Sequence, residues 1–154
     1  IHFRCGDIVV GKYPYHGILT LNYFKNIFNT LEFNKNIKVY FITQLSKNTI
    51  RDGDTNDLVN NAAYKCNYIV NEYTKELQKL IKPSKLIIIG DGNMNDDLYK
   101  MMNSKILICS ASTFCEIAAF GNKNKIIFPS NGPWKDWYYN FNIWYPNNHQ
   151  YIKT

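Results

Sequence analysis

The opening hexapeptide His2-Phe3-Arg4-Cys5-Gly6-Asp7 is the segment whose residue types point most directly to chemistry. Side chains alternate across a strand, so His2 and Arg4 share one face, where a buried guanidinium needs a partner. We therefore expect Arg4 at a strand end, where Gly6 turns the chain. Two interpretations are equally supported: Arg4 binds an anionic ligand, or it pairs with Asp7 and ties the turn. All but two of the 18 basic residues are lysines, which favours a need for the planar guanidinium at Arg4.

A second candidate segment, 109–115, has the sequence Cys-Ser-Ala-Ser-Thr-Phe-Cys and joins a predicted strand directly to a predicted helix. Its hydroxyl groups converge with the free amides of the helix N-terminus, an arrangement that can bind phosphate. Taken alone, the segment favours a simpler interpretation in which Ser112 caps the helix.

The elements that must position these segments follow an alternating βαβ pattern. Strands are predicted at residues 1–5, 38–43, 85–89, 105–109 and 125–128. Helices are predicted at about 18–33, 56–82, 96–103 and 112–121. We therefore predict the α/β class, with a Rossmann-like, doubly wound, parallel five-stranded sheet. In strand order 3-2-1-4-5 the first and fourth strands are neighbours, so Arg4 and Ser112 meet at the topological switch point as a pyrophosphate clamp.

Two motifs carry a resemblance to a known family. The first is His-x-Arg-x-Gly-Asp at 2–7, and the second runs from Asp97-Leu-Tyr-Lys-Met-Met through the apolar strand into Ser112-Thr113-Phe114. Ala118-Ala119 and the strand that ends at Pro129 continue the likeness. The sequence resembles the GDP-fucose-dependent fucosyltransferases of the α-1,2-, α-1,6- and protein O-fucosyltransferase group.

The resemblance implies an inverting, metal-independent glycosyltransferase of GT-B fold, of which this chain is the C-terminal, donor-binding half. Arg4 would be the catalytic residue that binds the donor diphosphate and supports its departure. The resemblance and the clamp together give an expected set of donor-binding residues: His2, Arg4, Asp7, Asp97, Ser112 and Thr113. The co-substrate would be GDP-fucose or another nucleotide sugar, the acceptor a glycan or protein hydroxyl, and no cofactor or metal is expected.

The sequence departs from the family pattern in two places. Cys5 stands where many members have a second Arg, and residues 90–93 read Gly-Asp-Gly-Asn where the family usually has Asp-Asp. The departure at Cys5 motivates an alternative, a catalytically silent module that binds a nucleotide or glycan. The acceptor pocket and the general base are expected partly in the other domain.

Length and composition limit the remaining classes. The chain has 154 residues, 45% of them apolar and 16% aromatic, which indicates a globular domain instead of a disordered one. No apolar run is long enough to span a membrane. The net charge of +6 motivates a nucleic-acid-binding α/β domain as a further alternative, but the lysines are scattered, so no nucleic-acid partner is expected.

We expect a domain at 1–132 and, at 133–154, an aromatic tail that packs on this domain or on a missing half. Because Ile1 lies inside a predicted strand, we interpret the chain as part of a larger protein. The sequence leaves two compartments open for it, the Golgi or ER lumen and the cytoplasm. The four cysteines have no CxxC spacing, so no zinc site is expected. Buried thiols are the favoured state, at Cys5 and Cys115 in particular, with disulfides left open.

Overall fold

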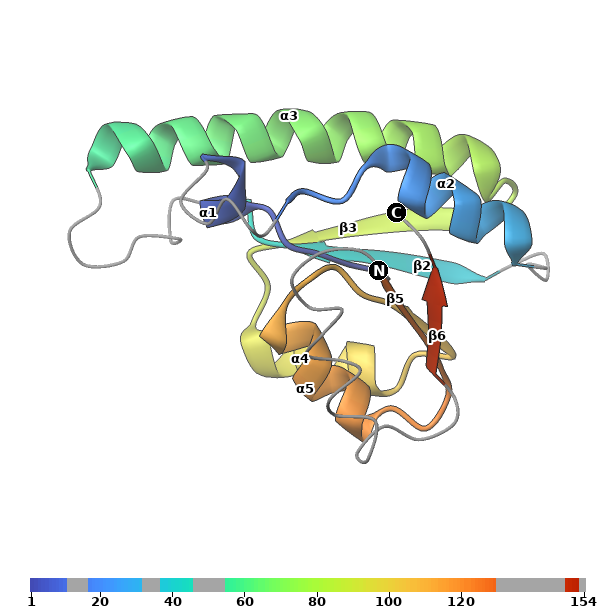
Figure 1. Ribbon diagram of the computed structural model, residues 1–154. Coiled ribbons are helices and arrows are strands. Elements are labelled where there is room, and N and C mark those ends of the chain that lie inside the picture. Colours follow the sequence, from blue (N-terminus) through green and yellow to red (C-terminus); the bar gives the residue numbers. More distant parts are fainter. Residues whose placement is uncertain (11–16, 32–36, 46–54, 130–148, 153–154) are drawn as a thin grey trace.

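The fold is α/β with parallel strands, as predicted. A computed structural model describes residues 1–10, 17–31, 37–45, 55–129 and 149–152 (Figure 1). In chain order the elements are β1 (His2–Phe3), α1 (Gly6–Val9), α2 (Leu21–Thr30), β2 (Lys38–Thr43), α3 (Asn56–Leu80), β3 (Lys85–Gly90), α4 (Met94–Met102), β4 (Ile106–Ile108), α5 (Thr113–Gly121), β5 (Lys125–Pro129) and β6 (His149–Ile152).

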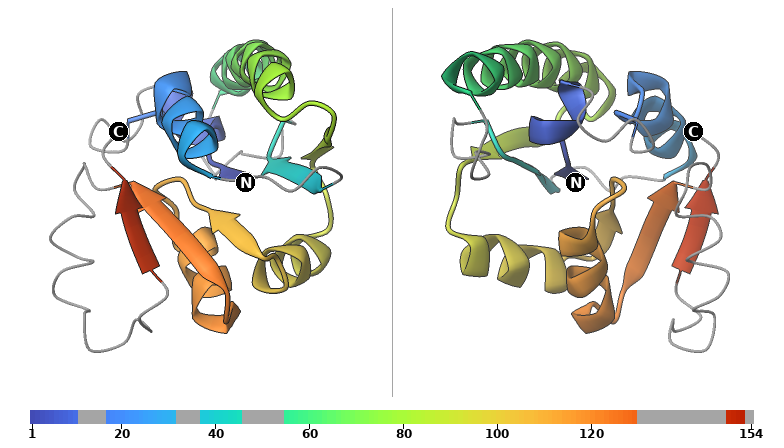
Figure 2. Two further views of the ribbon diagram at one scale, coloured as in Figure 1. Left: turned by 90° about the vertical axis from the view of Figure 1, so that its right-hand side faces the viewer. Right: turned by 60° about the vertical axis from the view of Figure 1, so that its left-hand side comes forward.

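The strands form two three-stranded parallel sheets, β1-β2-β3 and β4-β5-β6, so the predicted single five-stranded sheet is wrong. Figure 2 shows β4, β5 and β6 side by side in the second sheet. The sheets divide between β1 and β4, which are two and three residues long: β1 pairs with β2 and β4 pairs with β5, but no ladder joins β1 to β4. Their carboxyl ends still approach each other, because the Ser110 amide donates to the His2 carbonyl at 3.0 Å.

The helices begin where hydroxyl or amide side chains can cap them. The hydroxyl of Thr20 accepts from an amide in the first turn of α2, and Thr55 and Asn93 do the same for α3 and α4. All three helices are close to the predicted positions, although α2 is shorter at both ends. Gly121 ends α5, as predicted, and a Cβ at this position would collide with Met102.

Two elements were not predicted, for different reasons. The four-residue helix α1 is too short to show a hydrophobic period. Strand β6 lies in the segment predicted as an aromatic tail, and it extends the second sheet by pairing in parallel with β5. The rest of the predicted tail lies outside the described residues.

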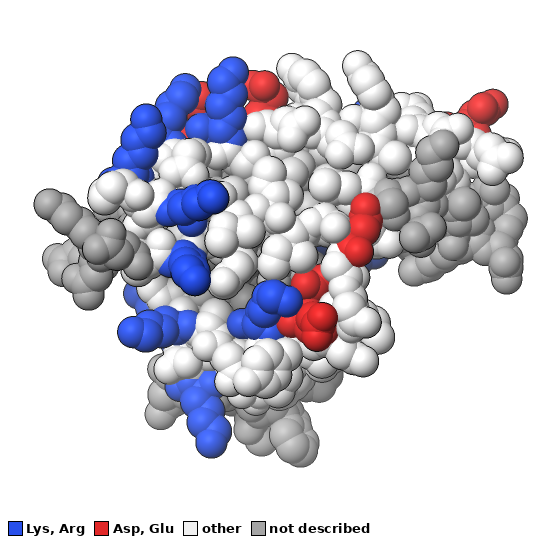
Figure 3. Space-filling model, turned by 180° about the vertical axis from the view of Figure 1, so that it is seen from behind, with Lys and Arg blue, Asp and Glu red and all other residues white. Residues whose placement is uncertain are grey.

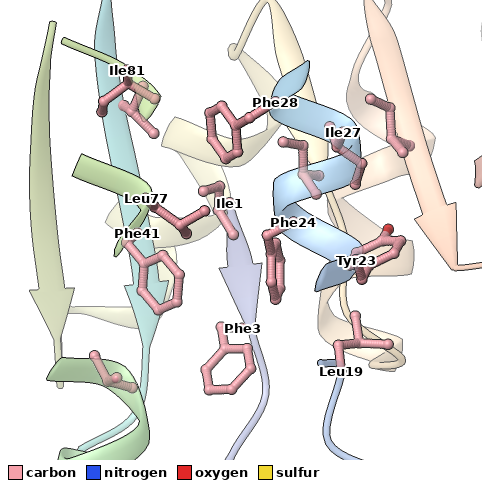
Figure 4. Close-up of a cluster of buried hydrophobic side chains, with 14 of the residues drawn as sticks. Ile1, Phe3, Leu19, Tyr23, Phe24, Ile27, Phe28, Phe41, Leu77 and Ile81 are labelled. Carbon is pink, nitrogen blue, oxygen red and sulfur yellow. The ribbon is translucent and has the colours of Figure 1, made fainter. Parts of the chain in front are cut away.

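The core has two layers on opposite sides of the strands (Figure 1). α2 and α3 cover one side, where Phe3 packs between Phe24 and Phe41 at ring-centroid distances of 5.9 and 5.5 Å (Figure 4). α4 and α5 cover the other side, where Ile42 joins a second buried cluster. Because side chains alternate, Phe3 faces the first layer and His2 the second. No helix within the described ranges is both long and apolar enough to cross a membrane.

Candidate functional site

Ser110 joins the two segments that the sequence analysis singled out. Its hydroxyl oxygen accepts from the Arg4 amide at 2.8 Å and lies 3.1 Å from Nδ1 of His2. Its own amide donates to the His2 carbonyl, so β1 and the end of β4 are joined through this one buried residue. Sequence reasoning counted Ser110 among several hydroxyl residues and gave it no role of its own. Its position directly after a buried strand was the available signal.

Removing the Ser110 hydroxyl should destabilise the protein. We expect Ser110→Ala to lower the free energy of unfolding by about 2 kcal/mol, because the Arg4 amide and the His2 ring lose a buried partner. Urea denaturation measures this loss. Ser112→Ala is the matched control, since Ser112 is also buried but its side chain makes no capping hydrogen bond. Equal losses in the two variants would contradict the role of Ser110.

The His2 ring is buried next to the Ser110 hydroxyl and is neutral. Its side chain is only 7% exposed, and its ring lies 5.7 Å from that of Phe114. Burial, together with the positive charges of the amino terminus and of Arg4, lowers the pKa of His2 to about 3. His2 is therefore buried, and its contact with the candidate site is the one between its ring and the Ser110 hydroxyl.

Arg4 lies at the carboxyl end of β1 and is half-buried. The chain then turns at once into α1, with Gly6 at a positive φ of 35°, a conformation that favours glycine. Asp7 belongs to α1, but its side chain is outside the described part of the structure. The choice between a ligand-binding Arg4 and an Arg4–Asp7 pair thus stays open.

Ser112 and Thr113 stand at the N-terminus of α5, as predicted. The predicted capping by the Ser112 side chain is wrong: Ser112 is buried and occupies the N-cap position without a side-chain capping bond. Thr113 is exposed. Tyr23 of α2 contacts the start of the 109–115 segment, because its buried hydroxyl donates to the Cys109 carbonyl at 3.2 Å. Sequence reasoning missed Tyr23, which was not among the residues predicted to form the buried face of this helix.

Disulfides fasten both segments, so the favoured expectation of buried free thiols is wrong. Cys5 is bonded to Cys66 of α3, and Cys109 is bonded to Cys115. The first bond ties the residue after Arg4 to the first helical layer. The second closes a short ring around residues 110–114, which contains both candidate serines. Each of the four cysteines is almost fully buried.

Asp97 is a buried carboxylate in the first turn of α4. Its Oδ1 has no hydrogen-bond partner in the described structure, and burial raises the pKa of Asp97 while the Lys100 charge lowers it. The carboxylate lies against Gly92, where an added Cβ would be 2.9 Å from both oxygens. α4 is on the same side of the strands as α5 (Figure 1), so Asp97 shares a layer with Thr113. The structure gives no hydrogen bond between Asp97 and the Ser110 group.

Asp91, at the position of the family's Asp-Asp motif, has a local backbone role. It has a positive φ of 54°, and its Oδ1 accepts from the Leu45 amide at 3.0 Å. It therefore links the residues that follow β2 and β3.

Within the described ranges, no three His, Cys, Asp or Glu side chains gather in a way that could hold a metal ion. Comparisons with protein-family models, curated proteins and solved structures found no match for this chain.

Proposed function

We propose that this chain is the donor-binding part of a fucosyltransferase-like glycosyltransferase with a Rossmann-like, GT-B-type architecture. It would bind a nucleotide sugar, GDP-fucose in the first instance, and the sugar would pass to a glycan or protein hydroxyl with inversion. The observation that supports this proposal is the Ser110 connection. It sets Arg4 at the end of β1 beside the loop that leads into α5.

In the proposed reaction the acceptor hydroxyl attacks the anomeric carbon from one face while the bond to the diphosphate oxygen breaks on the other. The acceptor's proton passes to a base, and negative charge grows on the departing diphosphate. The Arg4 guanidinium and the amides at the N-terminus of α5 are suited to stabilise this charge, because a cation and the free amides of a helix N-terminus both attract growing negative charge. Thr113 would add an exposed hydroxyl donor.

Titration calorimetry with GDP and GDP-fucose tests the donor site. Arg4→Ala should weaken binding at least about tenfold, because a charge-assisted hydrogen bond to phosphate is lost. Lys85→Ala is the matched control, since it removes an exposed positive charge at the amino end of β3 and should leave binding unchanged. If neither nucleotide binds the wild-type chain, or both variants bind equally, the donor-site proposal fails.

A catalytically silent binding module is the second candidate, and the fate of Cys5 favours it. The residue that stands where many family members have a second Arg is held in a disulfide with Cys66. A disulfide cannot bind diphosphate charge. In the longest available form of the protein, donor binding without GDP release in the presence of glycan and protein acceptors would favour this candidate.

A further inference from the structure

A groove of about 670 Å³ lies at the amino ends of the strands, at the opposite edge from the candidate site. Ile1 and residues 38–40 of β2 form one side, and residues 104–106 before and within β4 form the other. Phe28 of α2 and Met101 of α4 close it from the two helical layers. The lining is predominantly apolar, and nothing in the proposed function uses it.

The two long sides of the groove are strand edges. β2 pairs with β3 along all six of its residues, but β1 pairs only with its last two, Ile42 and Thr43. Residues 38–40 therefore have no strand beside them on this edge among the described residues. β4 pairs with β5 on one side and presents its other edge to the groove. Backbone N–H and C=O groups on such edges favour pairing with a further strand.

The register already sets where that strand would run. His2 lies opposite Ile42, and continuing this register without a break places three residues opposite Lys38, Val39 and Tyr40. The Ile1 nitrogen donates to the Tyr40 carbonyl at 2.7 Å, so the hydrogen-bond pattern of a parallel ladder reaches to the start of the groove.

We propose that the groove is the seat of an extended polypeptide strand that is joined to the Ile1 nitrogen and completes β1 between β2 and β4. Helical layers on both sides would cover its alternate side chains, so β-branched residues such as Val and Thr would suit both faces. Burial lowers the pKa of the Ile1 amine to about 5. An amide nitrogen at the same place would keep the bond to Tyr40 without a titratable group.

An anionic amphiphile is the competing occupant, because Lys38, Lys100 and Lys105 line the groove. Figure 3 shows basic side chains gathered on the left of the rear face, the side that carries the start of β2 and the end of α3. An acyl chain, however, offers no partners to the backbone groups of two strand edges. A polypeptide strand satisfies them and leaves the lysines at the rim in contact with water.

The test compares two fusions of equal length ahead of Ile1, Val-Thr-Val and Gly-Ser-Gly, each after the same initiator Met. The Val-Thr-Val form should melt about 5 °C higher, because only a β-forming segment adds buried pairing. Hydrogen exchange at the Tyr40 amide should slow at least about tenfold, since this amide lies on the same edge as the Ile42 amide that donates to Ile1. The Phe41 amide, on the β3 side, serves as the internal reference.

Three outcomes would overturn the proposal. Equal melting temperatures and equal Tyr40 exchange in the two fusions would show that the groove does not take a strand. If the free peptide acetyl-Val-Thr-Val-amide slowed exchange at the Tyr40 amide of the unfused chain as much as the Val-Thr-Val fusion does, the strand would not need to be joined to Ile1. A larger gain in melting temperature with laurate than with the Val-Thr-Val fusion would identify a pocket for an anionic amphiphile.

Discussion

Replacing Cys5 and Cys66 together with alanine should lower the free energy of unfolding by about 4 kcal/mol. The two cysteines are 61 positions apart, so their bond removes a large amount of conformational entropy from the unfolded chain. Both are buried, at 2% and 1% exposure, so the alanines would also lose some packing. Urea denaturation of the wild-type and double-variant chains, under oxidising conditions, measures the difference.

The second disulfide provides the matched control. Cys109 and Cys115 are 6 positions apart, and the same entropy argument gives a loss of about 2 kcal/mol for their replacement with alanine. The two double variants should therefore differ by a factor of about two in lost stability. Equal losses, or a larger loss at 109 and 115, would contradict the entropic account.

The disulfides show where sequence reasoning stops. The sequence predicts a buried Cys5, and the spacing of apolar residues along the helix at 56–82 includes Cys66 in its buried face; both residues are buried. Whether two inward cysteines meet depends on how far α3 lies along the sheet, which no local pattern encodes. The spacing of Cys109 and Cys115 is local, but it matches a strand-to-helix turn as well as a bonded ring.

The same limit applies to the candidate site. Strand order predicted that the ends of β1 and β4 would meet, and Ser110 confirms that they do. Two features could not be predicted, because each depends on distances between elements: the gap that divides the strands into two sheets, and the burial of Asp97 without a partner for Oδ1. The roles of Arg4, Ser112 and Thr113 stay predictions until nucleotide binding is measured.

Acid should destabilise the protein through His2. Its pKa is lowered to about 3 in the folded state, mainly by burial, from an ordinary value of 6.5. Between these values the unfolded chain binds a proton that the folded chain does not bind, so stability rises with pH in this window. Above pH 6.5 the titration of His2 costs no stability, and stability is lost as the pH falls from 6.5 toward 3. The loss is about 1.4 kcal/mol for each pH unit.

Other groups titrate in the same range, so the prediction is a difference between two chains. The buried Ile1 amine has the same sign of effect, because its pKa is lowered from 8.0 to about 5. His2→Asn keeps a hydrogen-bonding atom near the position of Nδ1, which faces Ser110, but it cannot be protonated. Urea denaturation from pH 7 to pH 4 should give the variant a shallower loss of stability, by about 1.4 kcal/mol per pH unit below pH 6. Parallel profiles would mean that the His2 ring takes up its proton in the folded protein, and the buried neutral ring beside Ser110 would then be the wrong description of this site.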